Sequence, residues 1–160
     1  MTNDRIIATL NDLIEALKDG EKGLALAAKD TREAELTRAF SDGVTTNRAA
    51  AAELQDQVRL LGGTAEQGRS MGAAVRRSWA SVRAMVSPRD DATIMEECER
   101  DERYVRGRYA EARELDLPGA IRSIVERHHR TIVEGHYRML DLRNRFRDRV
   151  PRANPDRTMP

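Results

Sequence analysis

Apolar residues recur at intervals of three and four along nearly the whole chain, and this spacing restricts its fold more than any other feature. Leu10, Leu13 and Leu17 show it near the start, and Ile121 and Val125 show it near the end. Residues spaced in this way lie on one face of an α-helix, whereas a half-buried strand needs strict alternation. No convincing alternating run is present, so the sequence predicts an all-α protein.

Glycine and proline residues divide the periodic stretches into segments. The spacing predicts four long helices, over residues 4–29, 31–61, 91–115 and 118–150, and a short fifth helix over 70–86. We expect Asp30 or Thr31 to cap the start of the second helix, Gly62 to end it, and Pro118 to open the last one. The polar tail, 151–160, is expected to be disordered.

The lengths of the connections predict how these helices are arranged. Very short loops make the first and second helices, and likewise the third and fourth, antiparallel neighbours. The segment 62–89 is long enough to travel the length of the bundle, which makes the second and third helices parallel. The prediction is one domain over residues 1–150, a ferritin-like four-helix bundle with one long crossover that contains the short fifth helix.

Composition excludes several classes of protein. The chain has 160 residues and a formal net charge of +1, which argues against a dedicated nucleic-acid-binding protein. Its single cysteine, Cys98, cannot form an internal disulfide, no apolar run is long enough to span a membrane, and no signal peptide is recognised. We therefore expect a cytoplasmic protein. The basic segment 69–89 can be interpreted as a membrane-surface or partner-binding helix, but we favour a crossover that packs on the bundle.

Polar residues interrupt the apolar stripes at similar heights in the predicted bundle. Glu21, Arg48, Glu102 and His136 come from one helix each, and their heights span roughly 12 Å, whereas His128 lies one layer deeper. Buried acids need a paired partner. The favoured interpretation is therefore a structural layer in which Arg48 lies between Glu21 and Glu102, with His136 as a further donor.

The alternative interpretation of these residues is a metal site. Di-iron proteins of the ferritin-like fold take one Glu from each of two helices and a Glu-x-x-His from each of the other two. The chain has one Glu-x-x-His, Glu126 with His129, and its second helix offers only Glu53, while Arg48 places a positive charge where a cation should lie. The metal candidates are Glu21, Glu102, His136, Glu53 and His129. No catalytic residue is assigned, and we expect no cofactor, with iron as the alternative.

Several short motifs resemble a bacterial family of uncharacterised four-helix-bundle proteins, over about residues 3–146. They are Asn11-Asp12-Leu13-Ile14, Asp19-Gly20-Glu21-Lys22-Gly23, Ala52-Glu53-Leu54, Leu60-Leu61-Gly62-Gly63, Glu97-Cys98-Glu99-Arg100 and the late His136. The resemblance implies the ferritin-like, rubrerythrin-related fold and no established activity. Unlike rubrerythrin, this chain has no paired cysteines for a rubredoxin-type iron.

The preferred expectation for function is a non-catalytic bundle, stress-related by analogy with its superfamily. One alternative is an iron-binding protein with oxidase or storage activity. The other is a scaffold that forms a homodimer or binds an unknown protein partner.

Overall fold

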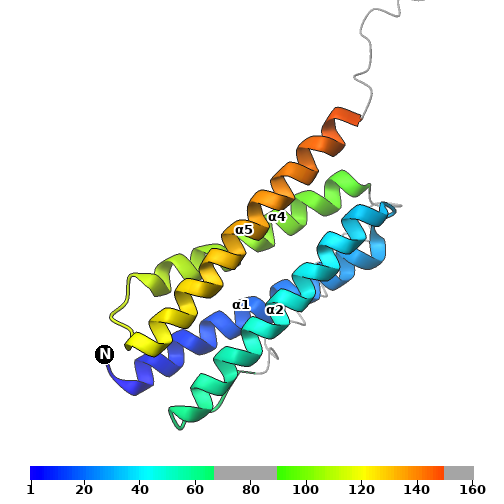
Figure 1. The fold of residues 1–160 in the computed structure, drawn as a ribbon. Coiled ribbons are helices and arrows are strands. Elements are labelled where there is room, and N and C mark those ends of the chain that lie inside the picture. Colours follow the sequence, from blue (N-terminus) through cyan, green and yellow to red (C-terminus); the bar gives the residue numbers. More distant parts are fainter. Residues whose placement is uncertain (67–89, 150–160) are drawn as a thin grey trace, which may run out of the picture.

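The computed structural model describes residues 1–66 and 90–149, and these form four long helices (Figure 1). They are α1 (Asn3–Asp30), α2 (Ala34–Leu60), α4 (Asp91–Arg113) and α5 (Gly119–Arg149). The four predicted long helices are confirmed, with small shifts at their ends. The helix expected over 70–86 and the tail 151–160 lie outside the described residues.

The order in which the helices pack confirms the predicted crossover topology. In Figure 1, α1 and α5 run in one direction while α2 and α4 run in the other. The most extensive contact is between α1 and α2, followed by α1 with α4 and α4 with α5, and the α2–α5 seam is the thinnest. Every helix in the described part is therefore antiparallel to its neighbours, and the parallel pairs lie on the diagonals.

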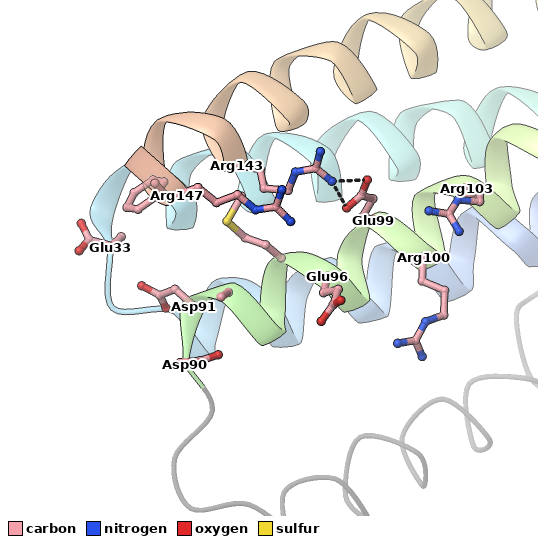
Figure 2. A pocket seen from close by; sticks show the side chains of 12 residues that line it. Glu33, Asp90, Asp91, Glu96, Glu99, Arg100, Arg103, Arg143 and Arg147 are labelled. Carbon is pink, nitrogen blue, oxygen red and sulfur yellow. Dashed lines mark hydrogen bonds and ion pairs between the residues drawn. The ribbon is translucent and has the colours of Figure 1, made fainter. Parts of the chain in front are cut away.

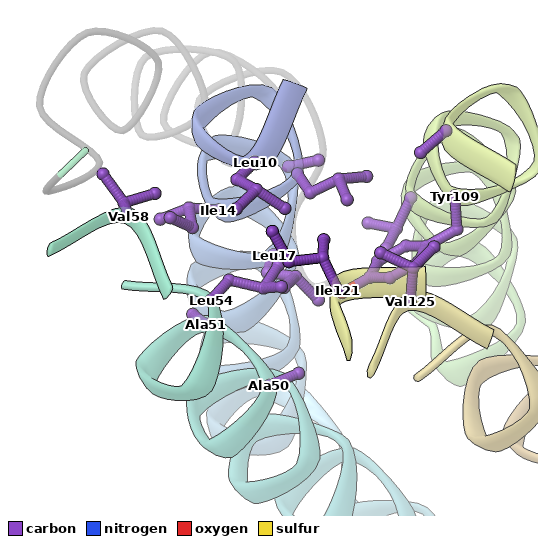
Figure 3. Close-up of a cluster of buried hydrophobic side chains, with 14 of the residues drawn as sticks. Leu10, Ile14, Leu17, Ala50, Ala51, Leu54, Val58, Tyr109, Ile121 and Val125 are labelled. Atoms are coloured by element: carbon purple, nitrogen blue, oxygen red, sulfur yellow. The ribbon is translucent and has the colours of Figure 1, made fainter. Parts of the chain in front are cut away.

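Two apolar clusters fill the two ends of the bundle. One lies around Leu10, Leu17, Leu54, Tyr109 and Val125, each at most 1% exposed (Figure 3). The other contains the buried residues Leu36, Phe40, Ile94, Met95, Cys98 and Leu142. Fully burying one such side chain contributes about 1.5–3 kcal/mol. The predicted stripes therefore face the core, and Glu21, Glu102 and His136 lie at a polar level between the two clusters.

The helix ends explain why the boundaries fall where they do. Thr2 caps α1 and Asp90 caps α4, each accepting a backbone N–H three residues later. The predicted cap at Asp30 or Thr31 is wrong, because Thr31 instead ends α1 and its Oγ1 donates to Asp91 Oδ1 at 2.9 Å. The second helix therefore starts three residues later, after Glu33, whose side chain makes no capping bond.

The end of α2 confirms the prediction at Gly62. This residue has a φ of +80°, a left-handed conformation that glycine adopts without steric cost. Its N–H donates to Arg59 O, and the N–H of Gly63 donates to Val58 O, both at 2.9 Å. These two bonds form a Schellman motif, which satisfies carbonyls at the helix end that would otherwise lack partners.

The chain that leaves α2 is held against α1 by one amide side chain. Asn11 Nδ2 donates to Thr64 O at 3.0 Å, and Asn11 Oδ1 accepts from the N–H of Glu66 at 2.8 Å. Gln55 Nε2 donates to Glu66 O at 3.0 Å. Asn11 therefore fixes the start of the crossover by using both ends of its amide.

Candidate functional site

The structure pairs Glu21 with Arg48 across α1 and α2. Arg48 Nε donates to Glu21 Oε1 at 2.8 Å, and Lys18 Nζ lies 3.6 Å from Glu21 Oε2. The Glu21 side chain is only 14% exposed, whereas that of Arg48 is 65% exposed. The guanidinium thus reaches the carboxylate from the solvent side and does not enter the core.

A second pair links α4 to α5. His136 Nδ1 donates to Glu102 Oε2 at 2.8 Å, and Arg106 Nε lies 3.8 Å from Glu102 Oε1. No hydrogen bond or ion pair between described residues joins this pair to Glu21 or Arg48. The expectation of one layer with Arg48 between the two glutamates is therefore corrected to two separate pairs, because Arg48 lies on the outer side of α2.

A third network crosses three helices, and it was only partly anticipated. His128 Nε2–H donates to Glu53 Oε2 at 2.7 Å, and Arg127 contacts both oxygens of the same carboxylate. Because Nε2 carries the proton, Nδ1 of the neutral ring accepts from the Tyr109 hydroxyl at 3.0 Å. Glu53 therefore interacts with His128 and Arg127, and α2, α5 and α4 are tied together.

Hydrogen bonds and burial together determine the protonation of this network. The hydrogen bonds from Arg127 and His128 hold the pKa of Glu53 below its ordinary value. Desolvation lowers the pKa of His128 and raises that of Tyr109. At neutral pH the network is therefore a carboxylate, a neutral imidazole and a neutral phenol, with every polar atom satisfied. Tyr109 is fully buried, so its hydroxyl has no access to a substrate.

The single Glu-x-x-His sequence does not form a site. Glu126 Oε2 accepts from Arg113 Nε at 2.9 Å, and its side chain is 37% exposed. His129 makes no hydrogen bond to a described residue, and burial lowers its pKa. Glu126 and His129 therefore do not converge with Glu53.

The di-iron pattern that the fold implies does not fit these residues. Within residues 1–66 and 90–149, no three His, Cys, Asp or Glu side chains converge in a way that can hold a metal ion. The remaining internal segment, 67–89, contains none of these four residue types. The five metal candidates are instead distributed among separate contacts. Glu21, Glu53, Glu102 and His136 take part in helix-to-helix pairs, whereas His129 lies near the charges of Arg113, Glu126 and Arg106.

Two acids that sequence reasoning missed lie between α1 and α4. Asp19 is 8% exposed, and neither carboxylate oxygen has a hydrogen-bond partner in the described structure. Burial, followed by the negative charges of Glu15 and Asp101, raises the pKa of Asp19 to about 6. Burial also raises the pKa of Asp101 to about 6.

Close helix approach explains how Asp101 becomes partly buried. A Cβ on Gly23 would lie 2.7 Å from Asp101 Oδ2, so the carboxylate lies directly against the backbone of α1. The small residues Gly20 and Gly23 were the available signal, because they allow α4 to approach α1 at this level. These glycines indicate a close contact between α1 and another helix, but they do not indicate that a carboxylate lies opposite them.

Two hollows in the described structure contain ionisable residues in their walls and are large enough to hold a small molecule. A cavity of about 130 Å³ lies at the polar level between the two apolar clusters, with Asp101 and Glu102 in its wall. A larger one, of about 680 Å³, lies where the start of α4 meets the end of α5 (Figure 2). There Arg143 points at Glu99 and contacts both of its oxygens at 2.7 Å, so its charge is already neutralised.

The arrangement of the helices defines the class of the molecule as a ferritin-like four-helix bundle. A solved two-domain protein from Anabaena variabilis, which contains DJ-1/ThiJ/PfpI-like and ferritin-like domains, matches it with a TM-score of 0.76 and 16% identity. The match covers 100% of this chain and 42% of that one, and at 16% identity it shows the fold alone.

The family model described as Domain of unknown function (DUF2383) matches residues 5–115, and the chain belongs to this family. The expected membership of an uncharacterised ferritin-like family is confirmed. No curated protein matches the chain significantly. None of the described helices is long and apolar enough to cross a membrane.

Proposed function

We propose that this protein is a non-catalytic ferritin-like bundle whose inward polar residues hold its helices in register. One observation carries the proposal. Each predicted site carboxylate is already paired with a cation or an imidazole on a neighbouring helix: Glu21 with Arg48, Glu53 with His128, and Glu102 with His136.

The energetics of partly buried charges support a structural role for these pairs. Removing one partner of a buried pair strands the other charge, whereas the intact pair adds little net stability over an apolar pair. Such pairs therefore act mainly on specificity, since a helix that slips by one turn separates them all. We also propose that the protein is cytoplasmic and, by analogy with its superfamily, stress-related.

Metal binding is the test that separates this proposal from the iron-binding alternative. The experiment is an anaerobic Fe(II) titration followed by desalting and elemental analysis, on wild type and on Glu21→Ala. Glu114→Ala, an exposed change at the end of α4, is the matched control. We expect no retained iron in any of the three. Two irons per chain, present in wild type and control but lost from Glu21→Ala, would replace our proposal with a di-iron protein.

A second candidate function is supported by the architecture of the Anabaena protein. There a ferritin-like domain and a DJ-1/ThiJ/PfpI-like domain share one chain. We propose that the present bundle can likewise act beside another protein, with a second copy of itself as the simplest partner. Sedimentation equilibrium at several concentrations tests the homodimer. A mass that stays that of a monomer up to about 100 µM would exclude a homodimer with a Kd at or below that concentration.

A further inference from the structure

The 130 Å³ cavity lies at the centre of the bundle, and residues of all four described helices line it. Leu24, Val105, Ile132 and Met139 give it apolar walls. Its exposed wall residues, Asp42 on α2 and Arg138 on α5, place the mouth at the thinly packed seam between those two helices. A small molecule can therefore enter without separating the well-packed α1–α2 pair.

The polar groups in the cavity wall are short of hydrogen-bond donors. Asp101 makes no hydrogen bond to a described residue. Glu102 accepts from His136 through Oε2, but its Oε1 is buried and accepts no hydrogen bond from a described residue, with Arg106 Nε no nearer than 3.8 Å. Asn47 uses its Nδ2 on Leu17 O at 3.4 Å, which leaves its carbonyl oxygen as a further acceptor. The cation in the described wall, Arg138, is at the exposed mouth. Buried acceptors without donors are costly, so the site favours an occupant that brings N–H groups.

We infer that this cavity binds a small organic ammonium ion, with the charged group at Asp101 and Glu102 and a short alkyl chain against the apolar wall. The size is suitable, because a cavity of about 150 Å³ holds benzene. An anion would meet two carboxylates. A metal ion would need a third ligand, and no third His, Cys, Asp or Glu of the described residues converges with Asp101 and Glu102.

The test is an NMR titration of ¹⁵N-labelled protein with n-butylammonium chloride, with n-butanol and sodium butyrate as neutral and anionic probes of the same chain length. We expect saturable shifts at the cavity residues with a Kd on the order of 1 mM or tighter. Butanol and butyrate are expected to bind at least about tenfold more weakly, because only the ammonium makes charge-assisted hydrogen bonds.

Two variants locate the site. Asp101→Asn keeps the shape and removes the charge, and it should raise the Kd for n-butylammonium at least about tenfold. Gly135→Leu fills the cavity, since the space beside Gly135 is open apart from an Arg138 nitrogen at 4.0 Å, and it should abolish binding. The controls are Glu96→Gln, an exposed charge change on the same helix, and Gly107→Leu, an exposed change on α4 with nothing within 4 Å.

Each adverse outcome overturns the inference in a distinct way. Absence of saturable shifts in the folded wild type would show that the cavity holds water only. Equal binding of n-butanol would show that the carboxylates do not select a cation. Unchanged affinity in Asp101→Asn and Gly135→Leu, with helical content equal to the controls by circular dichroism, would place any binding elsewhere.

Discussion

Replacing Asp19 by Asn should stabilise the protein at neutral pH. The carboxylate is 8% exposed and lacks a hydrogen-bond partner in the described structure, and its pKa is raised from 3.8 to about 6. Asn keeps the shape and carries no charge, so it resembles the protonated acid. The variant therefore removes the cost of ionising Asp19 without creating a cavity.

The shift sets the sign and the size of the effect. Because the folded-state pKa lies above the unfolded-state value, ionisation costs more in the folded protein, and stability falls as the pH rises through this range. The cost is absent below about pH 4, grows up to about pH 6 and is complete above it. Its upper limit is about 3 kcal/mol, and solvent screening reduces the expected gain to about 1–2 kcal/mol.

Urea denaturation followed by circular dichroism at about pH 4, 5, 6 and 7 measures this difference. The free energies of unfolding of wild type and Asp19→Asn should converge near pH 4 and separate towards pH 7. His128 contributes the opposite trend, since its lowered pKa makes stability fall as the pH drops below 6.5, but it is present in both proteins and cancels.

Asp116→Asn, an exposed change in the loop before α5, is the control and should stay within about 0.5 kcal/mol of wild type at every pH. The reasoning is refuted if Asp19→Asn is no more stable than wild type at pH 7. A gain of the same size at pH 4 and pH 7 refutes it equally, because it would not come from ionisation.

Three further substitutions test the other polar contacts through the same denaturation measurement. Arg48→Met should lower the free energy of unfolding by less than about 1 kcal/mol, because Arg48 contacts Glu21 from the solvent side. A loss above about 3 kcal/mol would instead support a buried layer of ion pairs. Tyr109→Phe should cost about 1–3 kcal/mol, since it leaves Nδ1 of His128 without its donor, and a neutral result would argue against that bond. Asn11→Asp should lower the free energy of unfolding by about 1–2 kcal/mol, because it removes the N–H donor to Thr64 O. An unchanged urea midpoint would show that this hydrogen bond does not stabilise the protein.

The fold follows from the sequence to a large extent, because its causes are local. The three-and-four spacing fixes the helices, and Gly62 ends α2 through its own backbone. Connection lengths then predict the directions of the helices, since short loops reverse the chain and segment 62–89 is long enough to span the length of the bundle. The error at Thr31 has a tertiary cause, because its hydroxyl binds Asp91, which is 60 residues away.

The polar contacts follow only in part, because they depend on how each helix is rotated about its axis. The heights of the residues along the helices correctly predict that Glu21 lies near Arg48 and that Glu102 lies near His136. The predicted contact between these two pairs is absent from the described structure because Arg48 faces solvent. The bond between His128 and Glu53 was missed because Glu53 lies off its apolar stripe. A helical-wheel projection places Glu53 on the solvent side of its helix, whereas in the structure the neighbouring helix covers part of its side chain.

Two acids between α1 and α4, Asp19 and Asp101, are not explained by the alignment of the helices, and Asp101 is the one that also lines the central cavity. Glu21 and Glu102 each have a partner on the adjacent helix, and those contacts suffice to align the helices. Asp101 has no such partner among the described residues, and burial raises its pKa to about 6, so its ionisation costs more in the folded protein. Residues kept at a cost in stability are commonly functional, and Asp101 lines the central cavity. Asp101→Asn should therefore raise the free energy of unfolding while weakening n-butylammonium binding. If the variant lowers the free energy of unfolding and weakens binding together, Asp101 has a structural role alone.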